Sequence, residues 1–164
     1  MRRPLLTILV LVVAALPAHA DAPVGQYEAF AKNLGFILDT KTHLRWQRFP
    51  DMVERPPLAA DDYCYKADSG AKGWGSPGGW RLPTVKELLT LVDEEPHDEF
   101  DPSLGTTGRR YIDRNAFAGT PTKLAYVALS PDSATTWIVD FATGTASRQN
   151  GTTASYYVRC VRAE

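Results

Sequence analysis

The chain has 164 residues, of which 44% are hydrophobic, and it carries 18 basic and 19 acidic residues. This length is enough for one domain with its own hydrophobic core. The near balance of charges argues against nucleic acid or an anionic membrane as the main partner, because both are bound largely through an excess of lysine and arginine.

The N-terminus has the pattern of a secretion signal. Two arginines precede an apolar run from Leu5 to Leu16, and the stretch ends in Ala18-His19-Ala20. The apolar run is shorter than the about 20 residues usual for a membrane anchor, and small residues near its end fit a signal peptidase. We therefore predict that residues 1–20 are a signal peptide cleaved after Ala20. The mature chain, residues 21–164, is then a single periplasmic or secreted domain without a stable membrane anchor.

Cleavage leaves few groups for metal or redox chemistry. The mature chain has 16 basic against 19 acidic residues, a net charge of −3, and its two histidines, His43 and His97, exclude a multi-histidine metal site. Cys64 and Cys160 are an even pair in an exported chain, which predicts one disulfide. Such a bond would close most of the domain into one loop and stabilise it by up to about 5 kcal/mol. A redox pair or metal-binding thiols remain the alternative, although neither cysteine has a neighbouring histidine or second cysteine.

The first predicted elements are two strands and a helix. Residues 34–38 and 43–47 are predicted strands around a turn at Asp39–Lys41, since apolar and polar residues alternate in the second of them. A proline-rich loop at 49–57 follows. The predicted helix then has one apolar face that points Cys64 inward. That face consists of Ala60, Tyr63, Cys64 and Ala67. Residues 69–79 contain five glycines and are predicted to be a loop.

A second helix is predicted by its start signal. Thr84 and Glu87 have the spacing of a capping box, in which each side chain pairs with a backbone N–H left free at the start of the helix. The apolar stripe of this helix is expected to consist of Val85, Leu88, Leu89 and Val92.

Six carboxylates crowd the segment from Asp93 to Asp101. Oxygen ligands of this kind are what calcium prefers, so a calcium site is one hypothesis. The favoured alternative is a solvated loop, because the carboxylates do not alternate with glycine as they do in a preformed calcium loop.

The C-terminal third reads as strands and turns. Strands are predicted at 125–129, 136–141 and 156–162, with a turn at 142–144. Asn150-Gly151 is a strong hairpin-turn signal and is predicted to join the last pair of strands. The triplet that it begins also matches a glycosylation acceptor, but we interpret it as a turn.

Several separated motifs together resemble the Legionella collagen-like protein C-terminal domain family, a bacterial domain of unknown function. The resemblance covers residues 34–162. The motif residues are Trp46, Trp80, Arg81, Leu82, Pro83, Thr84, Glu87, Trp137, Asp140, Phe141, Arg159 and Arg162. The resemblance implies an α+β, C-type lectin-like fold with two short helices, small antiparallel sheets and long loops. It further implies that the N- and C-terminal strands pair and that Cys64 is bridged to Cys160.

The chain departs from calcium-dependent lectins of this fold. Those lectins hold calcium and sugar through a Glu-Pro-Asn or Gln-Pro-Asp type loop and a Trp-Asn-Asp strand. Here the corresponding residues are Ser130-Pro131-Asp132 and Trp137-Ile138-Val139-Asp140. Ser130 lacks the amide oxygen, Ile138 and Val139 replace a ligand, and the two motifs lie too close together. Calcium is therefore possible but not supported as a cofactor. We predict no metal site and no cofactor.

The functional hypothesis is a non-catalytic binding module. Its long loop region, from about Phe100 to Ser133, is expected to recognise a protein or glycan of the cell surface or periplasm. Some relatives of the fold bind polyanionic sugars, which requires a basic patch, and Arg109, Arg110 and Arg114 are either such a patch or a solvated loop. Trp46, Trp80 and Trp137 are predicted to pack in the core. The ligand-binding candidates are Trp74, Arg109, Arg110, Tyr111 and Asp132.

An enzyme is the less favoured hypothesis. It is considered because sulfatase-activating oxidases share this general fold and use paired cysteines. The cysteines of those oxidases lie close together in a substrate groove, whereas Cys64 and Cys160 are predicted to form a structural disulfide. A hydrolase would need a histidine near Ser130 and Asp132, and His43 and His97 lie in unrelated segments. We therefore predict no catalytic residues.

Overall fold

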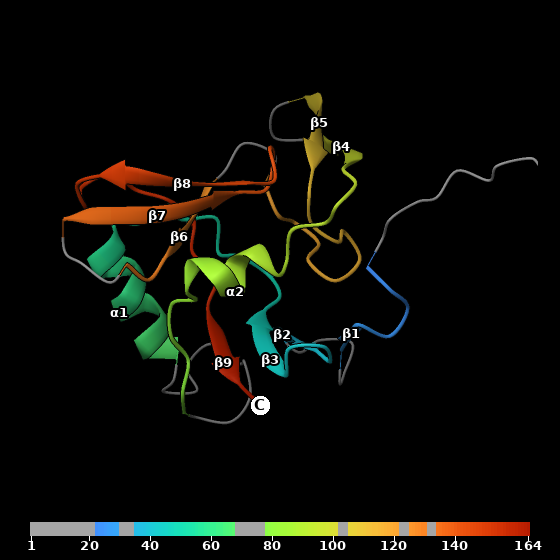
Figure 1. Cartoon of the computed structure of the whole chain (residues 1–164), viewed down its shortest axis with the longest axis horizontal. Helices are drawn as coiled ribbons and strands as arrows, with labels where there is room; N and C mark the ends of the chain where they lie inside the picture. Colours follow the sequence, from blue (N-terminus) through green and yellow to red (C-terminus); the bar gives the residue numbers. More distant parts are fainter. Residues whose placement is uncertain (1–21, 30–34, 68–77, 102–104, 122–124, 131–133) are drawn as a thin grey trace, which may run out of the picture.

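The computed structural model of the chain describes residues 22–29, 35–67, 78–101, 105–121, 125–130 and 134–164 (Figure 1). The predicted signal segment, Trp74 and Asp132 lie outside these residues. The described elements are β1 (Tyr27–Glu28), β2 (Phe36–Asp39), β3 (Leu44–Gln47), α1 (Pro57–Ala67), α2 (Val85–Leu89), β4 (His97–Asp101), β5 (Thr106–Arg110), β6 (Ala125–Ala128), β7 (Thr135–Asp140), β8 (Thr145–Asn150) and β9 (Val161–Ala163). They make an α+β fold of two short helices and small antiparallel sheets, consistent with a C-type lectin-like fold.

The first sheet joins the two ends of the domain, as predicted. Its strand order is β1-β2-β3-β9, and all its pairs are antiparallel. The turn between β2 and β3 is held by Asp39, whose Oδ1 accepts from the N–H of Lys41 at 3.0 Å and whose Oδ2 accepts from the hydroxyl of Thr42 at 2.7 Å. Aspartate favours turns for this reason, because its side chain can bond to the backbone two residues on.

Helix α1 carries the disulfide into the core. Its inner face contains Ala60, Tyr63 and Cys64, all buried, as the apolar spacing predicts. Cys64 is bonded to Cys160 with an S–S distance of 2.02 Å, and both residues are fully buried. The bond ties α1 to the segment that leads into β9, so the predicted pairing of the two cysteines is confirmed.

Helix α2 starts where the capping box predicts, but it ends earlier than expected. Leu89, expected on the apolar stripe, is 39% exposed, whereas Leu91 is 1% exposed and packs in the core. The chain tightens after Glu87, because the N–H groups of Leu91 and Val92 donate to the carbonyls three residues earlier. Three residues per turn place Leu88 and Leu91 on the same side, which corrects the expected stripe.

The acidic segment was predicted to be a loop, and this is wrong for its second half. Residues His97–Asp101 form β4, which pairs with β5 in a two-stranded hairpin that stands apart from the other sheets (Figure 1). In the register of the hairpin, Asp98 lies opposite Arg109. Nε of Arg110 lies 2.6 Å from Oε2 of Glu99. Opposite charges across the strands let a highly charged sequence form a strand pair.

The third sheet has the order β6-β7-β8, and it lies over α2 and α1 (Figure 1). The turn between β7 and β8 occupies Phe141–Gly144, as predicted. Strand β8 was not predicted, since most of its side chains are exposed and give no apolar alternation. Asn150 is therefore the last residue of β8 and Gly151 follows it, so the two do not join a pair of strands, which corrects the hairpin prediction. The last predicted strand is shortened to β9, and Tyr156 and Tyr157 make isolated bridges instead.

Two clusters of buried side chains form the core. Trp46 is in one cluster and Trp80 is in the other, with 0% and 3% exposure, so the core role predicted for both is confirmed. Trp137 is partly buried and packs against the first cluster. The disulfide belongs to the second cluster, together with Tyr63 and Leu82.

Candidate ligand-binding site

The family motifs bring distant segments together and so build the frame of the site. Arg81 pairs with Glu87 through two hydrogen bonds, Nη1 to Oε2 at 2.8 Å and Nη2 to Oε1 at 2.6 Å. Glu87 also accepts from the N–H of Thr84 at 2.8 Å, which completes the capping box. The Arg81 hydrogen bonds lower the pKa of Glu87, and burial opposes them. The backbone of Arg81 exchanges both hydrogen bonds with Val161, so this motif fastens the start of α2 to β9.

A fully buried arginine, Arg159, joins two further segments. Nη1 of Arg159 donates to the carbonyl oxygens of Gln47 and Arg48 at 2.6 and 3.0 Å, and Nη2 donates to the hydroxyl of Thr120 at 2.8 Å. The guanidinium carbon lies 4.7 Å from the ring centroid of Phe117, within the range of a cation–π contact. Arg159 therefore holds the segment after β3 against the segment that contains Phe117 and Thr120.

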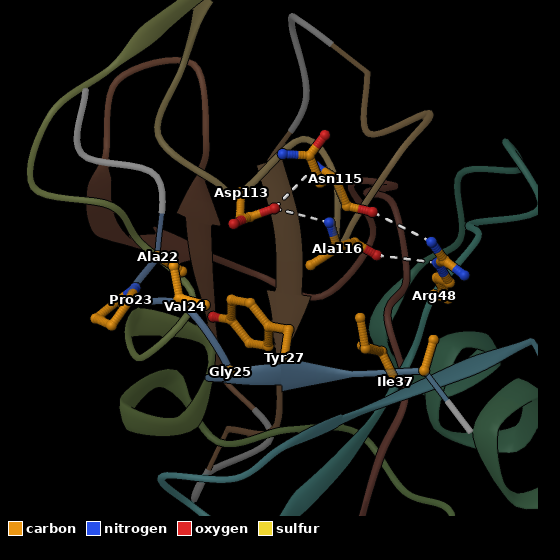
Figure 2. A pocket seen from close by; sticks show the side chains of 11 residues that line it. Ala22, Pro23, Val24, Gly25, Tyr27, Ile37, Arg48, Asp113, Asn115 and Ala116 are labelled. Carbon is orange, nitrogen blue, oxygen red and sulfur yellow. Dashed lines mark hydrogen bonds between the residues drawn. The ribbon is translucent and has the colours of Figure 1, made fainter. Parts of the chain in front are cut away.

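Between these segments lies a pocket of about 360 Å³, which we call the Asp113 pocket (Figure 2). One wall is the N-terminal segment from Ala22 to Tyr27, and the opposite wall is the loop from Asp113 to Ala116. Ile37 of β2 and Arg48 also line it. The volume is at the small end of the range of about 300–1,000 Å³ typical of ligand pockets.

Asp113 is the most constrained polar group of this pocket. Its Oδ1 accepts from the N–H groups of Asn115 and Ala116 at 2.8 and 2.7 Å, which fixes the bend of the loop. The residue is 7% exposed. Its Oδ2 has no hydrogen-bond or ion-pair partner among the described residues, and Figure 2 shows this oxygen directed away from the loop backbone that binds Oδ1. A carboxylate oxygen without a partner, on a residue that is only 7% exposed, favours a ligand that donates a hydrogen bond to it.

Arg48 closes the other end of the pocket. Its Nε donates to the carbonyl of Ala116 at 3.2 Å, and its Nη2 donates to the carbonyl of Asn115 at 3.2 Å (Figure 2). The guanidinium is thus used partly to hold the same loop that Asp113 bends. The side chain of Asn115 is exposed at this rim.

Tyr27 stands on the N-terminal wall. Its ring packs edge-on against Phe117, with 5.0 Å between the ring centroids and an interplanar angle of 80°. Burial raises the pKa of Tyr27, and the nearby Asp39, Asp93 and Asp113 raise it further. The phenol therefore stays neutral at physiological pH and is able both to donate and to accept a hydrogen bond.

A second pocket of about 360 Å³ lies beside the first, and we call it the Asp93 pocket. Ala22, Pro23 and Tyr27 line both pockets. The other residues of the second pocket are Gln26, Lys41, Thr90, Val92, Asp93 and Glu94. Its polar groups thus come from the N-terminal segment, from the turn after β2 and from the end of the α2 region.

The sequence-predicted binding residues lie elsewhere. Arg109 and Arg114 are exposed, but Arg110 is 4% exposed and pairs with Glu99, so it adds no exposed cation to a basic patch. Tyr111 is half-buried at the base of the hairpin, where its N–H donates to the carbonyl of Phe141 at 2.8 Å. Trp74 and Asp132 lie outside the described residues. The structure brings none of the three described candidates, Arg109, Arg110 and Tyr111, into either described pocket.

Sequence reasoning missed Tyr27, Arg48, Asp113 and Asn115, which line the Asp113 pocket. The signal that could have found Asp113 is local: an aspartate two residues before an asparagine, in a stretch with no strand or helix pattern, is typical of a turn that is fixed by its own side chain. The others are brought to the pocket only by strand pairing and by the arginine contacts. In the described part of the chain, no three His, Cys, Asp or Glu side chains gather closely enough to hold a metal ion.

Comparison with known proteins agrees with the motifs. The family model of the Lcl C-terminal domain matches residues 35–162. Searches among curated proteins and among solved structures gave no match. Of the helices that the structure describes, none has the length and apolar character needed to cross a bilayer. The matched residues include the paired strands β2 and β3, the capping box, the disulfide and the loop of Asp113. The chain therefore belongs to the Lcl C-terminal domain family.

Proposed function

We propose that this chain is an exported, non-catalytic binding domain that recognises a glycan at the cell surface or in the periplasm. The observation that carries the proposal is Asp113, a nearly buried residue that lines a pocket and whose Oδ2 oxygen has no hydrogen-bond partner among the described residues. Sugar hydroxyls are donors of the kind that such an oxygen accepts. Asp113 and Asn115 also belong to the loop region between Phe100 and Ser133, in which the sequence places the binding function.

Export is supported by two independent features. The N-terminal sequence has the charged, apolar and small-residue parts of a signal peptide. The disulfide between Cys64 and Cys160 is of the kind that persists in oxidising compartments.

The binding hypothesis is also supported over the oxidase alternative by the state of the cysteines. Both are fully buried and bonded to each other, so neither offers a thiolate to a substrate. An oxidase of the sulfatase-activating kind needs accessible cysteines in a groove. A hydrolase would need a histidine as its general base. The ring of His43 pairs with the exposed Glu164 and lies outside both described pockets.

The test is glycan binding by the full chain produced in an exporting host. The wild-type protein and the Asp113→Asn variant are compared on a panel of immobilised neutral, amino and acidic oligosaccharides. Asparagine keeps the Oδ1 oxygen that bends the loop and replaces Oδ2 with a donor, so the fold is retained and binding is expected to fall by about tenfold or more. Asp61→Asn on the exposed face of α1 is the matched control and is expected to bind like the wild type. Equal binding by the two variants, or no glycan bound at all, would contradict the proposal.

A further inference from the structure

The Asp113 pocket and the Asp93 pocket are neighbours, because they share lining residues. Each has a volume of about 360 Å³, and Ala22, Pro23 and Tyr27 line both. Three sets of contacts hold the shared segment: β1 pairs with β2 through two residues, Thr40 donates to the carbonyl oxygens of Gly25 and Gln26, and Tyr27 packs against Phe117. A ligand longer than one pocket would therefore meet the second pocket next.

Carboxylates outnumber cations around the two pockets. Asp113 lines the first pocket, and Asp93 and Glu94 line the second. Among the described lining residues, Arg48 and Lys41 are the cations, and Arg48 already donates through Nε and Nη2 to loop carbonyls.

Tyr27, which lines both pockets, is affected by the same carboxylates. Beyond the effect of burial, Asp39, Asp93 and Asp113 all raise the pKa of Tyr27, and only Arg159 lowers it. Carboxylates thus approach Tyr27 from both pockets and from the β2 turn.

This charge distribution selects the chemistry of the ligand. A sulfated or carboxylated sugar would place like charges beside these carboxylates, which is unfavourable. A protonated amine, in contrast, donates charge-assisted hydrogen bonds to a carboxylate, and these are stronger than the hydrogen bonds of a neutral hydroxyl. The unpartnered Oδ2 of Asp113 is the position proposed for one such bond, because Asp113 is only 7% exposed as a residue and its other oxygen is used by the loop backbone.

We propose that the two pockets are adjacent subsites for one linear oligosaccharide whose sugars carry free, protonated amino groups. One amine binds Asp113, and a second amine, further along the chain, binds Glu94 and Asp93. The proposal rests on the proposed function, because it specifies the glycan that the Asp113 pocket binds.

The experiment is calorimetric titration of the full chain from an exporting host with three probes: glucosamine, its linear tetramer and the tetramer of N-acetylglucosamine. The titration is run at about pH 5.5, where the amino groups of the probes are protonated. The acetylated tetramer has the same length and hydroxyls but no charge. The protein variants are Asp113→Asn, Glu94→Gln and the control Asp61→Asn; Glu94 is exposed, so its variant is expected to fold like the wild type.

We expect the amine tetramer to bind wild type about tenfold or more tightly than the acetylated tetramer. Glu94→Gln is expected to weaken the tetramer about fivefold or more and the monomer by clearly less, because the monomer binds chiefly at Asp113, while Asp113→Asn weakens both. Equal affinity for the two tetramers would overturn the amine inference and leave glycan binding itself intact. An effect of Glu94→Gln that is absent, or the same for monomer and tetramer, would show that the pockets are not subsites of one ligand. Absence of binding to every probe and to the glycan panel would reject the proposed function as well.

Discussion

Gly144 lies directly against the ring of Tyr111, so closely that a Cβ added at position 144 would stand 2.9 Å from Cδ1 of that ring. The glycine also has a φ of +68°, in the left-handed region that other residues rarely adopt. The contact joins the β7–β8 turn to the base of the β4–β5 hairpin, where Tyr111 bonds to Phe141.

Gly144→Ala is therefore expected to lower the free energy of unfolding by about 1 to 3 kcal/mol, because it adds both backbone strain and a steric overlap. Urea denaturation measures this loss. Gly151→Ala is the control: its φ is +85°, but a Cβ there meets nothing within 4 Å, so it carries the strain alone. If Gly144→Ala lowers the free energy of unfolding no more than Gly151→Ala does, the contact with the Tyr111 ring does not restrict position 144.

The ion pair of Arg81 and Glu87 predicts a specific pH dependence of stability. The pKa of Glu87 is lowered in the folded state, chiefly by Arg81, so the pair stabilises the fold above the unfolded pKa of about 4.3 and stops doing so as the pH falls through the folded value. Glu87→Gln is expected to be less stable than wild type at pH 7. The two proteins should converge as the pH falls below about 4, as measured by urea unfolding at several pH values. A difference that stays constant down to about pH 2 would contradict the predicted linkage.

Arg159 offers a test of the buried frame. Arg159→Met removes the donors to the carbonyls of Gln47 and Arg48 and to the hydroxyl of Thr120, and it leaves these acceptors buried. At about 1 kcal/mol or more for each unsatisfied group, the loss of stability is expected to be about 2 to 4 kcal/mol. Arg114→Met, at an exposed position, is the control. A loss at Arg159 within about 0.5 kcal/mol of the control would show that the guanidinium is not needed to hold these segments.

The disulfide predicts both a mass and a stability. The protein from an exporting host should contain no free thiol and should weigh two hydrogens less than the reduced chain. The Cys64→Ala, Cys160→Ala double variant is expected to lose up to about 5 kcal/mol, since the bond closes a sequence separation of 96 residues. Two reactive thiols in the folded wild-type protein would contradict the bond and reopen the oxidase alternative.

Sequence reasoning succeeded where the signal was local. The capping box at Thr84 and Glu87 begins α2, and the apolar spacing around Cys64 gives the buried face of α1. It was wrong where a neighbouring segment determines the secondary structure. The charged sequence of β4 is typical of a loop, and it forms a strand because Arg109 and Arg110 of the neighbouring strand β5 offset its negative charge.

The candidate site was beyond local patterns for the same reason. Tyr27, Arg48 and Asp113 are distant in the chain, and none carries a motif of its own. They meet because β1 pairs with β2 and because Arg48 and Arg159 hold the segments around the pocket. The family resemblance supplied the frame of the fold, whereas the pocket is visible only when the pairing of strands is known.

The bond between Cys64 and Cys160 also determines what happens when the backbone is cut. Proteolysis at any peptide bond between these two residues leaves the two fragments covalently joined, and strand pairing still holds them in register. If the chain is exported, as we propose, the domain would then survive proteolytic cleavage of an exposed loop as one molecule. On a gel the cut would become visible only after reduction.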